Sequence, residues 1–188
     1  MRVPPVPKPP SVLVRIAYRL ARRRLGKVPS AFQVIYGNAP HLARPSYTIA
    51  RTLEKKLSLP DDLTLLVTTQ SSLLNGCSFC ADLHRAQAIR AELGMERFRD
   101  LLEFRTSPGF SAAECAALTF TEEITRERKA SEATFEALRS HFDDRQIVEL
   151  AWLNGIANFF NLEALALGLA SDGLAELASP SARRGAAT

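Results

Sequence analysis

The chain has few of the residues that would place it in several common classes of protein. It contains three cysteines in 188 residues, too few for the disulfide framework of a small secreted domain. No apolar run is long enough to span a bilayer, and the proline-broken start MRVPPVPKPP lacks the apolar stretch and cleavage site of a secretory signal. From these absences we expect a cytoplasmic protein without a membrane partner.

Acidic residues are missing from the first part of the chain. Residues 1–53 carry ten Lys and Arg but no Asp or Glu, so the remainder carries a net charge of −6 against a total of +4. A basic arm could attract nucleic acid, anionic lipid or the acidic body of a second subunit. Because the segment has no nucleic-acid-binding module and few interleaved aromatics, we expect a subunit contact or a solvated face, and no nucleic-acid partner.

Strand-like alternation of polar and apolar residues is missing as well, and helical periodicity replaces it almost throughout. The pattern predicts an all-α, single-domain helical bundle. We expect a basic, proline-rich arm and first helix over 1–28, a helical domain over 29–172 and a flexible tail over 173–188. The expected helices span residues 11–24, 29–36, 40–57, 61–74, 77–93, 95–104, 111–128, 131–142 and 145–169. In the first helix, Leu13, Ile16 and Leu20 fall on one side and arginines on the other.

The feature that points to chemistry is CSFCADLH at 77–84, a Cys-x-x-Cys followed four residues later by histidine. On a helix, spacings of three and four residues put Cys77, Cys80 and His84 on one face. The Asn-Gly pair at 75–76 ends the preceding helix, so Cys77 should lie in a first turn whose free N–H groups favour thiolate. His84 could accept the Cys80 proton or return one to a leaving group. The motif therefore predicts a redox centre.

Two other interpretations of the motif remain open. Cys-x-x-Cys-x-x-x-His supplies three zinc ligands, but a structural site normally needs a fourth, and only His41, His141 and Cys115 are left to provide one. Alternatively, the two cysteines fill a core, as free cysteines often do. We favour the redox interpretation over both and expect neither a metal nor a cofactor.

The expected helix over 145–169 carries a second set of polar residues. Asn154, Asn158 and Asn161 recur at helical spacing among large apolar side chains. Buried amides must find hydrogen-bond partners, so we expect bonds to neighbouring helices or to another subunit rather than direct chemistry.

Three stretches, taken together, resemble a known family. They are CSFCADLH at 77–84, ALTFTE at 117–122, and QIVEL at 146–150 leading into ANFFN at 157–161. The resemblance is to the carboxymuconolactone decarboxylase superfamily, in particular its alkylhydroperoxidase D-like branch. It implies an all-helical fold, assembly as a homo-oligomer (trimer or hexamer), and reduction of hydroperoxides by a cysteine pair with a histidine proton relay.

Carried over by this resemblance, Cys80 attacks the peroxide and becomes a sulfenic acid, Cys77 resolves it as a disulfide, and His84 manages protons. A thiol or disulfide reductase then donates electrons. The chain departs from the family at two positions, with Leu65 in place of the relay glutamate and Phe79 in place of a histidine between the cysteines. Two alternatives therefore stay open: a non-enzymatic redox-sensing oligomer, and a lactone decarboxylase-like lyase that uses His84 and the buried asparagines.

Overall fold

The computed structural model describes residues 1–179, apart from the side chains of Glu54 and Lys55. Within this range every regular element is a helix, which confirms the all-α fold. The longer helices are α1 (Val12–Leu25), α2 (Ala43–Lys55), α3 (Asp61–Leu74), α4 (Ser78–Arg90), α6 (Ala112–Glu127) and α8 (Asp144–Ala166). The shorter elements are η1 (Phe32–Tyr36), η2 (Pro40–Leu42), α5 (Met95–Arg99), η3 (Leu101–Glu103), α7 (Glu132–Arg139) and α9 (Leu174–Ala178).

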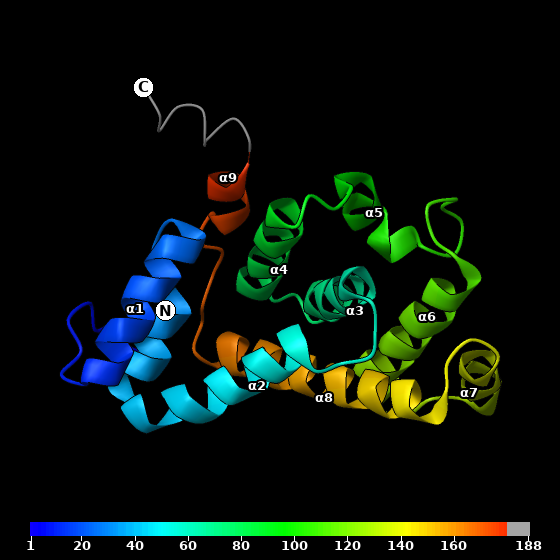
Figure 1. Ribbon diagram of the computed structural model, residues 1–188, viewed down its shortest axis with the longest axis horizontal. Helices are drawn as coiled ribbons and strands as arrows, with labels where there is room; N and C mark the ends of the chain where they lie inside the picture. Colours follow the sequence, from blue (N-terminus) through cyan, green and yellow to red (C-terminus); the bar gives the residue numbers. More distant parts are fainter. Residues whose placement is uncertain (180–188) are drawn as a thin grey trace.

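Helix α3 lies in the middle of the bundle, with α4, α6 and α8 packed around it (Figure 1). Its apolar residues Leu63, Leu66 and Val67 are buried, and so is a run of polar residues over 68–72. The large core forms around α3. Its other buried members come mainly from α6, α8 and the shorter helices α5, η3 and α7. Leu118, Leu138 and Leu150 are fully buried there. This core fixes the helix that leads directly into the cysteine motif.

The first helix packs through a face that the sequence pattern does not indicate. Helix α1 buries Val14, Tyr18 and Ala21, and the Tyr18 hydroxyl lies 3.0 Å from the carbonyl oxygen of Val6 and 3.1 Å from that of Phe32. The side that carries Leu13, Ile16 and Leu20 is exposed to solvent instead. We call Val12, Leu13, Ile16 and Leu20 the α1 stripe.

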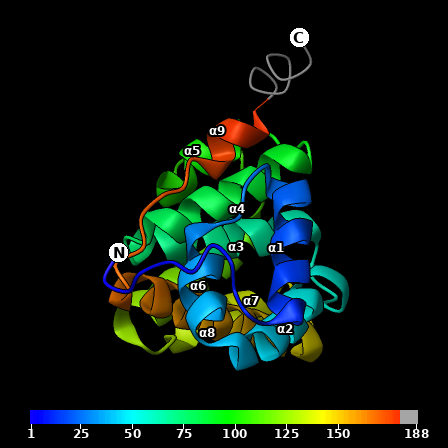
Figure 2. The same ribbon diagram turned by 90° about the vertical axis from the view of Figure 1, so that its left-hand side faces the viewer.

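The N-terminal arm, residues 1–10, lies against the body of the protein. In Figure 2 it runs across one face of the molecule toward α1. The Arg2 amide donates to the Leu167 carbonyl at 2.9 Å, and the Val6 amide donates to the Gln33 carbonyl at 3.0 Å. Gly37 is required at the crossing, because a Cβ there would lie 2.8 Å from the Cβ of Val6.

Residues 173–179 differ from the flexible tail expected over 173–188. They contain helix α9, which packs against α4 (Figure 2). Leu174 and Ala178 are completely buried against Ala86. Residues 180–188 of the expected tail lie outside the described range.

The local signals for helix starts are largely confirmed. Ser111 and Asp143 form the N-terminal capping boxes of α6 and α8, and α3 spans the expected 61–74. The expected 29–36 helix continues through Gly37 and Asn38 instead of ending there. No helix within residues 1–179 is both long and apolar enough to cross a membrane.

Candidate redox site

The two cysteines of the motif are joined by a disulfide at the start of α4, with their Cα atoms 5.4 Å apart. Gly76 adopts a positive φ of 70°, which lets the chain turn sharply between α3 and α4. Cys77 is the N-cap of α4, and its sulfur accepts the Cys80 amide N–H at 3.3 Å. A helix N-terminus that donates to a sulfur stabilises negative charge there, so the expected thiolate-favouring position of Cys77 is present.

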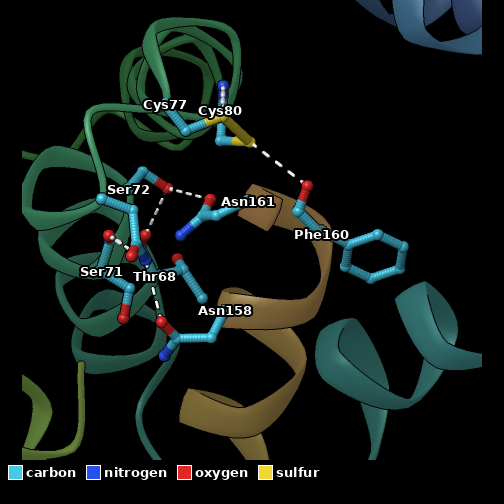
Figure 3. Close-up of a disulfide and its surroundings, with 9 residues drawn as sticks. Thr68, Ser71, Ser72, Cys77, Cys80, Asn158, Phe160 and Asn161 are labelled. Atoms are coloured by element: carbon cyan, nitrogen blue, oxygen red, sulfur yellow. Dashed lines mark hydrogen bonds between the residues drawn. A yellow bond between two sulfur atoms is a disulfide. The ribbon is translucent and has the colours of Figure 1, made fainter. Parts of the chain in front are cut away.

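Both sulfurs lie in a small apolar cluster, where Cys77 is 1% and Cys80 5% exposed. We call this group the cysteine cluster; its buried members are Ala31, Val34, Cys77, Phe79, Cys80, Ala164 and Leu169, with Val3, Ile35, Leu83 and Leu167 packed against it. Phe79, at the position where the family resemblance calls for a histidine, is part of this apolar wall. On the other side, the Cys80 sulfur lies 4.0 Å from the carbonyl oxygen of Phe160 on α8 (Figure 3).

The asparagines of α8 hold the end of α3 in place (Figure 3). The Ser72 hydroxyl donates to Asn161 Oδ1 at 3.1 Å, and Asn75 Nδ2 donates to Asn158 Oδ1 at 2.9 Å. The Ser72 carbonyl in turn accepts the Cys77 amide N–H at 2.9 Å. The expected hydrogen bonds to a neighbouring helix are therefore present, and they position the turn that carries Cys77.

His84 lies one turn after Cys80 on α4, and its Nδ1 pairs with Gln87 Oε1 at 3.1 Å. Burial lowers its pKa, an effect that the Gln87 hydrogen bond partly offsets. The imidazole is therefore neutral at pH 7 and able to accept a proton. Within the described residues it makes no hydrogen bond to either cysteine, so its part in a relay stays a prediction.

Leu65, at the family's glutamate position, is partly buried and packs against the large core rather than the cysteine cluster. Nearby on α3, Gln70 is 1% exposed, and its Oε1 has no hydrogen-bond partner among the described residues. A neutral amide cannot serve as a general acid or base. The family's carboxylate has no replacement on this part of α3.

Asp82 is a residue of the motif whose role the sequence does not reveal. Its carboxylate accepts hydrogen bonds from the Ser171 hydroxyl at 2.9 Å and from the amides of Asp172, Leu174 and Ala175 at 3.0, 2.9 and 2.8 Å. Burial raises its pKa, but these four hydrogen bonds outweigh burial and hold the pKa below its usual value. Asp82 thus clamps the chain before α9 onto α4. The only sequence signal was a carboxylate next to residues expected to be buried.

No group of three His, Cys, Asp or Glu side chains within residues 1–179 is placed to hold a metal ion. The third cysteine, Cys115, packs against the large core, with its sulfur 3.7 Å from the Phe104 carbonyl. Burial and the nearby Glu114 charge raise its pKa, and Arg105 partly offsets them. Cys115 therefore has the environment of a core thiol rather than a reactive one.

Comparisons with known proteins agree with this geometry. Residues 47–123 match the carboxymuconolactone decarboxylase family. The chain is 27% identical to the uncharacterized protein YnjA of Escherichia coli over 179 residues, which is 94% of this chain and 97% of that protein.

Two solved structures share the fold. A protein of unknown function from Agrobacterium tumefaciens, a putative antioxidant defence protein AhpD, is 25% identical with a TM-score of 0.68, over 72% of this chain and 94% of that one. A cysteine-to-alanine variant of the debrominase Bmp8 in complex with 2,3,4-tribromopyrrole is 20% identical with a TM-score of 0.83, over 95% of each chain. The family match over residues 47–123 and the shared fold support the resemblance to the carboxymuconolactone decarboxylase family and its alkylhydroperoxidase D-like branch.

Proposed function

We propose that the protein is a thiol-dependent peroxidase, a disulfide oxidoreductase that reduces hydroperoxides with the Cys77–Cys80 pair. The family match and the shared fold support a peroxidase-related or decarboxylase-like role. The observation that carries the finer proposal is the disulfide itself, which sits at a helix N-terminus inside an apolar cluster. Such a pair cycles between dithiol and disulfide without a cofactor.

The surroundings of the two sulfurs support a division of labour. Cys80 is the more exposed of the two, so it is the thiolate that attacks the peroxide. The attack forms an S–O bond as the O–O bond breaks, and it leaves a sulfenic acid on Cys80 and an alcohol or water. Cys77, kept in the thiolate form by the helix N-terminus, then attacks the Cys80 sulfur and displaces water. An external dithiol or disulfide reductase returns the pair to the reduced state.

His84 is the proton acceptor for Cys80 in this proposal. Its neutral imidazole lies one helical turn away, and burial keeps the pKa of the ring below its ordinary value. Because Leu65 and Phe79 replace two polar groups of the family, hydroperoxide reduction depends on fewer proton donors than in family members that keep them.

A second electrophile is worth testing because the cysteine cluster is apolar. A thiolate can also attack a halogen atom, and a dithiol plus a carbon–bromine bond gives a disulfide, a carbon–hydrogen bond and HBr. The likeness to a debrominase that binds tribromopyrrole makes a brominated pyrrole the probe to use.

We also propose that the protein works as a homo-oligomer, a trimer or hexamer. The α1 stripe is exposed, and a second exposed apolar row runs along α8 through Val148, Trp152, Phe159 and Leu162. Apolar faces of this extent are typical of subunit interfaces. The basic first part of the chain and the acidic remainder provide complementary charge for such contacts.

The deciding experiment follows peroxide consumption by the reduced protein with several hydroperoxides and with tribromopyrrole, while free thiols are counted. We expect turnover with hydroperoxides that is lost, by about 10³-fold or more, in Cys80→Ser. Cys115→Ser is the matched control and should keep full turnover. Disulfide formation without catalytic turnover would favour the redox-sensing oligomer, and lactone decarboxylation that survives Cys80→Ser would favour the lyase.

A further inference from the structure

Peroxide reduction needs a proton donor for the leaving oxygen, and among the residues described so far only His84, once it has taken the Cys80 proton, could return one. When the O–O bond breaks, the leaving oxygen must be protonated, and a positioned acid accelerates this step. The family's carboxylate position holds Leu65, and His84, a neutral base, is paired with Gln87. If the proposed function holds, a carboxyl group elsewhere at the cysteine cluster could supply this proton.

Glu163 on α8 is such a group. It follows Phe160 by three residues, and the carbonyl oxygen of Phe160 lies 4.0 Å from the Cys80 sulfur. Its helix neighbours Ala164 and Leu167 both belong to the cysteine cluster. Since residues three and four apart share a helix face, Glu163 lies at the edge of this cluster, within about one turn of the contact with Cys80.

The carboxylate has no structural partner. Glu163 is partly buried, yet its carboxylate forms no hydrogen bond or ion pair with any residue in the range 1–179. Glu149 on the same helix shows the contrast, because Ser58 and Arg145 hold its carboxylate through hydrogen bonds. Desolvating a carboxylate without a partner costs free energy, so Glu163 gains no stability from its position.

The groups that face Glu163 leave it protonated over a wider pH range than usual. Burial raises the pKa of Glu163. Burial raises the pKa of Tyr36 of η1, a hydrogen bond to Ser46 lowers it, and the Glu163 charge is close enough to raise it further. Arg2 of the arm donates to the Ala166 carbonyl at the end of the helix. A carboxyl group whose pKa is raised stays protonated to higher pH and can then donate a proton.

We propose that Glu163 is the general acid of the Cys77–Cys80 centre, in place of the carboxylate that the family carries at the position of Leu65. The Cys80 thiolate attacks the distal peroxide oxygen, the O–O bond breaks, and the departing alkoxide takes the proton of Glu163 to leave as an alcohol. Glu163 is then a carboxylate, which recovers a proton from water or from His84 after His84 has taken the Cys80 proton. Cys77 resolves the sulfenic acid with release of water.

The test is Glu163→Gln, which removes the proton and the charge together and so moves two measurements in opposite directions. Peroxide turnover falls by about 10²-fold. In the wild type, turnover decreases at alkaline pH as the acid loses its proton; in the variant this decrease is absent. Alkylation of Cys80 by iodoacetamide, measured between about pH 7 and 9 and located by peptide mapping, becomes about two- to fivefold faster, because a nearby negative charge no longer opposes the thiolate.

Two variants complete the design. Glu163→Asp keeps part of the turnover and the alkaline limb, and Glu127→Gln, which changes an exposed carboxylate on α6, leaves both measurements unchanged. Turnover that survives Glu163→Gln overturns the proposal, as does a parallel fall in turnover and alkylation, which would mark a structural role. If the wild type reduces no hydroperoxide, the proposed function fails by itself. An unchanged alkylation rate would still remove Glu163 from the neighbourhood of Cys80.

Discussion

The large core and the cysteine cluster are built from different kinds of segment. The large core joins the long helices α3, α6 and α8, whose buried leucines recur at helical spacing. The cysteine cluster joins pieces that lie far apart in the sequence: the arm through Val3, the turn η1, the start of α4 and the end of α8. Two of these pieces, α4 and α8, also contribute to the large core, α4 through Ala88 alone among its buried residues.

We infer that the large core stabilises the fold and that the cysteine cluster carries the reactivity. The large core has enough enclosed apolar surface to fix the fold, whereas the wall of the cysteine cluster includes an arm held by a few backbone hydrogen bonds. Segments with few buried contacts open locally at lower free energy than the whole domain. Redox chemistry at buried sulfurs therefore fits the part of the molecule that can open without unfolding.

The largest effect is expected when a side chain is truncated in the large core. Leu118→Ala should lower the free energy of unfolding by about 2–5 kcal/mol, since Leu118 is completely buried and leaves a cavity. Val34→Ala in the cysteine cluster should cost less, about 1–2 kcal/mol, but should speed alkylation of the reduced cysteines. Chemical denaturation and thiol alkylation on both variants measure the two quantities.

The two regions would not differ in local opening if the two variants behaved alike. Equal acceleration of alkylation by Leu118→Ala, at a temperature where both variants remain folded, would mean that the sulfurs are exposed only by global unfolding. Cys115 serves as the internal reference in the same samples, because it packs against the large core. Its alkylation should follow Leu118→Ala and not Val34→Ala.

Sequence patterns predict the large core far better than they predict the cysteine cluster. The starts of α3, α6 and α8 and the turn before Cys77 follow from local residue preferences, and all are found within one residue of where they are expected. The cysteine pair is also readable, because spacing alone brings its members together. The cluster around it is not, since nothing in a local pattern indicates that Val3 or Leu169 packs beside Cys80.

The same limit explains the two differences at the ends of the chain. Leu13, Ile16 and Leu20 form an apolar side as regular as a core-facing one, but the hydroxyl of Tyr18 and the arm fix α1 by its other face. The segment 173–179 is short and rich in small side chains, so its sequence resembles that of a flexible tail. What orders them is a carboxylate about ninety residues earlier, a contact that periodicity cannot reveal.

Asp82 provides the next effect in size. Asp82→Asn should lower the free energy of unfolding by about 2 kcal/mol at pH 7, because an amide accepts the four hydrogen bonds less well than a charged carboxylate. Since the folded pKa of Asp82 lies below its ordinary value of 3.8, this stability is fully present above that value. It is lost as the pH falls through the lower, folded pKa.

Thermal unfolding of both proteins from about pH 7 to pH 3 measures this dependence. The difference between wild type and Asp82→Asn should stay constant down to about pH 5 and shrink in more acid solution. Asp144→Asn is the control, because this exposed carboxylate in the first turn of α8 makes no such set of bonds. A difference that is independent of pH would show that Asp82 contributes through packing rather than through its charge.

The smallest effect on the stability of a single subunit is expected at the α1 stripe. The same site tests contacts between subunits. Ile16 is 46% exposed, so Ile16→Asp should change the stability of an isolated subunit by no more than about 0.5 kcal/mol. If the stripe is covered by a second copy, the same change buries a charge in an apolar interface and disrupts assembly. Light scattering should then report a fall from a multiple of 20.7 kDa toward the subunit mass.

Leu102→Asp, at a residue of η3 that is 53% exposed, is the matched control and should leave the assembly intact. A wild type that stays monomeric at high concentration would remove the oligomer from the proposal. An assembly that both variants leave intact would remove α1 from the interface and leave the exposed row on α8 as the surface to test.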